Sequence, residues 1–66
     1  MEVTVNGKGR NFPDDATAKD LLNDLGLDPR GVVVEVNLSI LKRDSVESHR
    51  LRDGDQIEIL RFVGGG

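Results

Sequence analysis

Residues 1–7 read MEVTVNG, and this stretch predicts how the fold begins. Apolar and polar side chains alternate over the first five residues, and β-branched residues are frequent, which is typical of a strand with one buried face. Asn6-Gly7 then favours a two-residue hairpin turn, because both central positions of such a turn need a positive φ. We expect a return strand from about Arg10 to Phe12, with Phe12 in the core.

A single helix is expected to start at Thr17. The Thr17 hydroxyl can cap it by accepting the backbone N–H of Asp20, in the manner of a capping box. Gly26 fits the left-handed position that ends a helix. Between these two signals, one apolar face recurs at helical spacing and is formed by Ala18, Leu21, Leu22 and Leu25.

The second half of the chain predicts three more strands. Residues 32–37 read VVVEVN and form a buried strand by composition, and a short strand is expected at 40–41. A turn at 53–55 leads into a final strand at 56–63. The segment 45–49 is ambiguous and fits one helical turn.

This order of elements predicts an α+β protein. One main helix lying across a four- to five-stranded mixed sheet, with the first and last strands central, is the β-grasp (ubiquitin-like) arrangement. We expect a globular domain over residues 1–63 and a flexible glycine tail at 64–66. The expected core residues are Val3, Val5, Leu21, Leu22, Leu25, Val34, Val36, Ile57 and Ile59.

The final strand breaks its own alternation. Ile57 and Ile59 lie on one face, whereas Leu60 and Phe62 are apolar on the other. This break indicates a bulge, a strand covered on both faces, or an exposed surface on which a partner docks. The candidate partner-binding residues are Leu60, Phe62, Val63, Gly64 and Gly65.

Composition excludes several classes of site. The chain has no Cys, so disulfides, thiolate metal sites and Cys nucleophiles are excluded. His49 is the only His, and we expect no metal site because zinc needs three or four protein ligands. No basic block, apolar span or signal-peptide pattern is present, so we expect a cytoplasmic protein that binds neither nucleic acid nor membrane.

We expect no catalytic centre within the domain. Ser45 and Ser48 with His49 form the only Ser/His set, and a solvated turn explains these three residues better. The carboxylates of the 53–58 segment fit turn chemistry. A chain of 66 residues is also small for a water-excluding pocket.

The ending Gly64-Gly65-Gly66 directly follows an apolar strand and is the best candidate for chemistry. Glycine has no Cβ, so such a segment can thread a narrow channel in a partner enzyme. The carboxylate of Gly66 would be ionised at neutral pH. It could attack the α-phosphate of ATP, and the mixed anhydride would then accept a sulfur or amine nucleophile.

Three segments resemble the ThiS and MoaD-like sulfur carriers: residues 34–37 leading to Arg43, the run DGDQIEI at 53–59, and the ending FVGGG at 62–66. The short length and the FVG part of the ending favour the thiamine-biosynthesis type. Many relatives carry Asn-Gly-Glu where this chain has Asn37-Leu38-Ser39.

The resemblance implies a carrier that is not itself an enzyme. An E1-like (ThiF-like) adenylyltransferase would use ATP to adenylate Gly66, and the domain itself would bind no cofactor. A sulfur donor such as a cysteine desulfurase would supply the sulfur of a thiocarboxylate, which passes to a ThiG-like thiazole synthase. The free domain is expected to be a monomer.

Three other functions stay open at this point. The chain could be the small sulfur-carrier subunit of molybdopterin synthase. It could be a β-grasp interaction module whose tail does no chemistry, or a protein modifier that forms isopeptide bonds.

Overall fold

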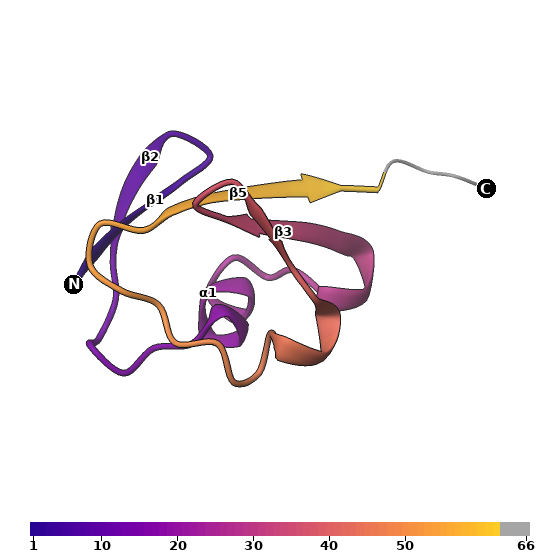
Figure 1. Ribbon diagram of the computed structural model, residues 1–66, viewed down its shortest axis with the longest axis horizontal. Helices are drawn as coiled ribbons and strands as arrows, with labels where there is room; N and C mark the ends of the chain where they lie inside the picture. Colours follow the sequence, from indigo (N-terminus) through magenta and orange to yellow (C-terminus); the bar gives the residue numbers. More distant parts are fainter. Residues whose placement is uncertain (63–66) are drawn as a thin grey trace.

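A mixed sheet with one α-helix on one face makes up the computed structural model, which describes residues 1–62 (Figure 1). The strands and the helix are β1 (Glu2–Val5), β2 (Lys8–Asn11), α1 (Ala18–Asp24), β3 (Val32–Val36), β4 (Ser39–Leu41) and β5 (Gln56–Arg61). Two short 3₁₀ turns, η1 (Pro29–Gly31) and η2 (Arg43–Ser45), flank β3 and β4. The predicted tail at 64–66 lies outside the described residues, as does the predicted domain boundary.

The sheet has five strands in the order β2-β1-β5-β3-β4. β1 runs parallel to β5, with Thr4 opposite Gln56 and Val5 opposite Ile57. The other three pairs, β1 with β2, β3 with β4 and β3 with β5, are antiparallel. The α+β, β-grasp prediction is therefore confirmed, with the last strand at the centre of the sheet and the first beside it.

The hairpin turn between β1 and β2 forms where it was predicted. Asn6 and Gly7 have φ values of 49° and 84°, as a two-residue turn of this kind requires. The return strand starts at Lys8, earlier than the predicted Arg10, because so tight a turn leaves no loop between the strands. Phe12 is half-buried at the rim of the core.

Helix α1 begins with the predicted capping box. The Thr17 Oγ1 accepts the Asp20 backbone N–H at 3.2 Å, and the Asp20 Oδ2 accepts the Thr17 backbone N–H at 2.9 Å. Two N–H groups that the first helical turn leaves free are thereby satisfied. Gly26 follows the helix with φ 71°, the left-handed conformation expected of it.

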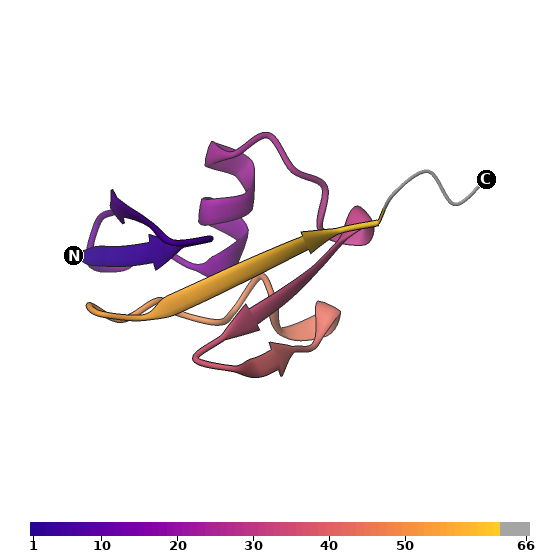
Figure 2. The ribbon, with the colours of Figure 1, turned by 90° about the horizontal axis from the view of Figure 1, so that it is seen from above.

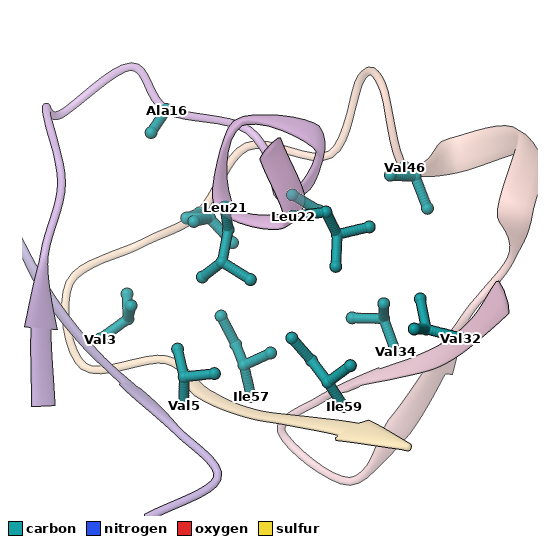
Figure 3. Packing of buried hydrophobic residues seen from close by; sticks show 12 residues of the cluster. Val3, Val5, Ala16, Leu21, Leu22, Val32, Val34, Val46, Ile57 and Ile59 are labelled. Carbon is teal, nitrogen blue, oxygen red and sulfur yellow. The ribbon is translucent and has the colours of Figure 1, made fainter. Parts of the chain in front are cut away.

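The core lies between α1 and one face of the sheet (Figure 3). Leu21 and Leu22 point from the helix toward Ile57 and Ile59 of β5, and all four are buried. Val36 and Leu25, which were expected in the core, are half-buried against it. The buried hydrophobic residues are Val3, Val5, Ala16, Ala18, Leu21, Leu22, Val32, Val34, Val46, Leu51, Ile57 and Ile59.

The outer face of the sheet is bare. Figures 1 and 2 show α1 and the 42–55 segment on one side of the sheet, with no element on the other side. β5 pairs with β3 without interruption from Arg61 to Ile57, so the bulge expected from its broken alternation is absent from this strand. Covering on both faces was also a wrong expectation, because Leu60 is 55% and Phe62 is 63% exposed.

Candidate functional site

β5 carries the chain to the candidate site and is held firmly along its length. β3 pairs with it over five residues and β1 over two. The Asn6 side chain adds a clamp from the hairpin turn, because its Oδ1 accepts the Ile59 N–H at 2.7 Å and its Nδ2 donates to the Ile59 carbonyl at 3.3 Å. Phe62 follows the strand and donates its N–H to the Gly31 carbonyl at 3.1 Å. The backbone is therefore held in place as far as Phe62.

Apolar side chains lie near this point on the outer face of the sheet, and all of them are exposed except the half-buried Val33. Val33 lies directly opposite Leu60, and both point away from the core because their neighbours Val32, Val34 and Ile59 point into it. Ile40 is 69% exposed. We call Val33, Ile40, Leu60 and Phe62 the outer apolar patch.

Two further observations connect the members of this patch. Ile40 pairs with Glu35, and Glu35 pairs with Glu58, so these side chains share the outer face. A small surface pocket of about 180 Å³ is lined by Val33, Ile40 and Phe62, among others. Sequence alternation identified Leu60 and Phe62, whereas Val33 and Ile40 could be found only from the strand register.

The pair Asp28 and Arg30 lies close to the end of β5, since Asp28 and Phe62 line one shared surface pocket. Hydrogen bonds from the Arg30 side chain, and then from its backbone N–H, lower the pKa of Asp28 to about 2. The same contacts raise the pKa of Arg30. Because both groups are exposed, this ion pair contributes little to stability.

The Ser/His set rejected from the sequence does not form a nucleophile and base. Ser45, Ser48 and His49 line one pocket, but the Ser48 hydroxyl donates to the Ser45 backbone carbonyl at 3.4 Å. Within residues 1–62, no hydrogen bond joins the His49 ring to either serine.

Of the two acidic residues beside Gly54, Asp55 serves the turn, as predicted, whereas the Asp53 side chain joins the turn to β1. Asp53 Oδ1 accepts the Glu2 N–H at 2.7 Å, and Asp55 Oδ2 accepts the Arg52 N–H at 2.8 Å. The part of the chain that the structure describes has no cluster of three residues arranged to hold a metal ion. No helix in it is long and apolar enough to cross a membrane.

The sequence profile of the ThiS family matches residues 3–66, nearly the whole chain. This chain belongs to the ThiS family. The sulfur carrier protein ThiS of Bacillus subtilis is 40% identical over 65 residues, which cover 97% of this chain and 98% of that protein. The crystal structure of the thiamine biosynthesis protein ThiS from Geobacter metallireducens is 35% identical, superposes with a TM-score of 0.83 and covers 100% of both chains.

A second group of relatives is much longer. The thiazole synthase of Paramagnetospirillum magneticum is 44% identical over 66 residues, and that of Magnetococcus marinus is 36% identical over 66 residues. The match covers 100% of this chain but only 20% of either thiazole synthase. This chain thus spans about a fifth of their length.

The predicted acceptor Gly66 and the partner-binding residues Val63, Gly64 and Gly65 lie outside the described residues. Their roles stay predictions. The structure brings the other two predicted residues, Leu60 and Phe62, together with Val33 and Ile40 on one exposed surface.

Proposed function

We propose that this chain is a cytoplasmic sulfur carrier of thiamine biosynthesis, with the Gly66 carboxylate as its acceptor. The observation that supports the proposal most is the family match, which extends to residue 66 and covers nearly the whole length of the Bacillus subtilis sulfur carrier. The exposed apolar patch around the end of β5 supports it independently, because a carrier must present its end to partner enzymes.

The chemistry would proceed in two steps on the same carboxyl group. A Gly66 carboxylate oxygen attacks the α-phosphorus of ATP, a P–O bond forms, and pyrophosphate leaves. The outer persulfide sulfur of a donor such as a cysteine desulfurase then attacks the carbonyl carbon, a C–S bond forms, and AMP leaves. A thiol finally reduces the S–S bond that still joins carrier and donor, which releases the thiocarboxylate and leaves a disulfide on the thiol side. The partner adenylyltransferase supplies ATP and catalysis, whereas this chain supplies a carboxylate at the end of a segment without side chains.

The reach of the last residues suits this role. Residues 63–66 can span at most about 14 Å when fully extended, at 3.3–3.6 Å per residue. Gly66 could therefore enter a narrow channel while Phe62 stays at the surface of the partner. Phe62 is the main anchor we propose for that surface, since aromatic residues are enriched at the cores of interfaces, and Leu60 lies beside it on the same face.

Thiazole synthase is the partner that we propose to receive the sulfur. In two proteins of that name, a region similar to this chain makes up a fifth of the whole. When a carrier-like region and a thiazole synthase are parts of one protein, they act side by side. This supports the proposal that a separate carrier chain also binds a separate thiazole synthase.

Adenylation by an E1-like enzyme tests the proposal. The chain is incubated with the adenylyltransferase of its own host and ATP, and the product is located by mass spectrometry of the intact protein and its C-terminal peptide. AMP on the Gly66 carboxylate is expected, and a chain that lacks residues 64–66 should accept none. AMP on a side chain, or no adduct at all, contradicts the carrier function. The intact mass of the protein from its native host shows whether Gly66 is its terminus.

Phe62→Ser tests the docking surface. Because Phe62 is 63% exposed, folding should survive, whereas adenylation at limiting carrier concentration should fall by about tenfold, as for an interface residue worth more than 1 kcal/mol. Leu38→Ser is the matched control, since Leu38 is 89% exposed at the turn that follows β3. If both variants are adenylated as well as the unchanged chain, Phe62 is not part of the docking surface. The adenylyltransferase would then recognise only residues 63–66.

A further inference from the structure

A second surface site lies at the opposite end of β5. A pocket of about 640 Å³ is open there between the end of β3 and the segment 45–52. The side chains that concern us here are those of Ser45, Ser48, His49, Arg50, Arg52 and Asp55. We call this the arginine pocket.

The backbone places the two arginines of this pocket on the same side. Leu51 between them is 3% exposed and lies in the core, and its N–H donates to the Ala16 carbonyl at 2.9 Å. Arg50 forms an extended bridge with Thr17. Arg50 and Arg52, on either side of Leu51, are both exposed and both line the pocket.

The one carboxylate in the lining is already satisfied by the protein. Asp55 is 7% exposed, its Oδ2 accepts the Arg52 backbone N–H at 2.8 Å, and its Oδ1 accepts the Asn37 Nδ2 at 2.9 Å. Neither partner is a guanidinium, so no hydrogen bond or ion pair joins Asp55 to the side chains of the two arginines.

The basic side chains of the pocket are not engaged by the protein within the described residues. Among the contacts of residues 1–62, no hydrogen bond or ion pair involves the side chain of His49, Arg50 or Arg52. Arg10 and Arg30 each pair with a carboxylate, whereas Arg43 and Arg61 stand singly, outside this pocket. A cluster of unpaired donors is therefore concentrated in one hollow of a protein whose net charge is −3.

We propose that the arginine pocket binds a small phosphate-bearing anion. Guanidinium groups match the geometry of phosphate oxygens in bidentate pairs, and the hydroxyl of Ser45 is an additional donor. The volume lies within the range of ligand pockets, about 300–1,000 Å³. A strand rises about 3.3 Å per residue, so Asp55 in the pocket and Phe62 are on the order of 23 Å apart along the chain. The site is thus separate from the outer apolar patch and does not depend on the carrier chemistry.

Nuclear magnetic resonance of the whole chain without any partner tests this proposal. The ¹⁵N-labelled protein is titrated with inorganic phosphate and with glycerol 3-phosphate, and in parallel with sodium chloride at matched ionic strength. Saturable shifts confined to the amides around residues 45–52 are expected for one or both phosphates. Tighter binding of glycerol 3-phosphate would assign the pocket to an organic phosphate, and equal binding would assign it to the phosphate group alone.

A double variant decides whether the two arginines make the site. Arg50→Gln with Arg52→Gln should weaken phosphate binding at least tenfold. The control, Arg10→Gln with Arg30→Gln, loses the same charge elsewhere and should bind as the unchanged chain does. Arg50→Lys with Arg52→Lys keeps the charge and loses the bidentate geometry, so an intermediate loss is expected even if the glutamine variant folds poorly.

Three results would overturn the proposal. Shifts that do not saturate, or that chloride reproduces, would indicate general screening. Equal weakening by the two glutamine variants would mean that net charge alone is sensed. Binding of a poly-glutamate peptide in the absence of any phosphate response would assign the surface to an acidic protein segment.

Discussion

At the scale of single residues, Leu38 has an unfavourable backbone conformation, with a positive φ. Asn37 and Leu38 form the turn between β3 and β4 with φ values of 52° and 72°. Asn tolerates this region, whereas a Leu there is strained because of its Cβ. The Asn37 side chain holds the turn, since its Nδ2 donates to Asp55 and its Oδ1 accepts the Gln56 N–H at 2.9 Å. The departure from the Asn-Gly-Glu pattern of many relatives therefore falls on a strained position.

Leu38→Gly should stabilise the domain by about 1 kcal/mol, because glycine adopts a positive φ without steric cost. Urea unfolding followed by circular dichroism measures the change. Leu38→Ala is the control, since it removes the exposed apolar side chain but keeps the Cβ. Equal gains from the two variants would show that surface hydrophobicity, and not backbone strain, is responsible.

Leu22→Ala should destabilise the domain by about 2–5 kcal/mol through lost burial and a cavity. Leu22 is 0% exposed between α1 and the sheet. Leu60→Ala is the same chemical change at a side chain that is 55% exposed, and it should cost no more than about 1 kcal/mol. The two free energies of unfolding are compared directly, and similar losses would contradict the assignment of Leu60 to an open surface.

At the scale of elements, local signals in the sequence were sufficient wherever an element is stabilised locally. The start of α1 was predictable because Thr17 and Asp20 form its capping box within one turn, and the first hairpin because Asn6-Gly7 encodes its turn. Burial in irregular segments was not predictable. Val46 and Leu51 are core residues only because long-range packing places their segment against the helix.

Asp28 caps η1, and its carboxyl group should titrate at an unusually low pH. Because the folded-state pKa of Asp28 is lowered to about 2, its carboxylate favours the folded state above pH about 3.8, and this contribution disappears as the pH falls toward 2. A carbon-detected carboxyl titration should place the Asp28 midpoint near 2. Arg30→Gln should move it upward, because the side-chain donor is the largest cause of the shift. A midpoint near 3.8 in the unchanged folded chain would contradict the hydrogen bonds at this cap.

At the scale of the whole molecule, the candidate site combines what one strand encodes with what only the sheet reveals. Leu60 and Phe62 were predicted from the alternation of a single segment. Val33 and Ile40 join them because β3 lies between β4 and β5, an arrangement that pairs residues far apart in the sequence. The alternation of a sequence predicts which side chains of a strand share one face. It does not predict which strands lie beside it in the sheet.

Removal of residues 64–66 should leave the stability of the domain nearly unchanged. All buried hydrophobic residues of the described chain lie between Val3 and Ile59, and glycines have no side chains to bury. The free energy of unfolding should change by no more than about 0.5 kcal/mol. Thermal unfolding measures this, with Leu22→Ala as a positive control. A large loss would mean that the glycines are packed against the domain.

The parallel pairing of β1 with β5 has a mechanical consequence. The Thr4 N–H donates to the Asp55 carbonyl and the Asn6 N–H to the Ile57 carbonyl, each at 2.9 Å, so the two strands are joined side by side. Tension applied between Met1 and Phe62 pulls these strands past each other and loads their hydrogen bonds simultaneously, in shear. A hairpin such as β1–β2 can instead be peeled open one bond at a time. The domain should therefore keep its shape when a partner pulls on the end of β5 while the N-terminus is held.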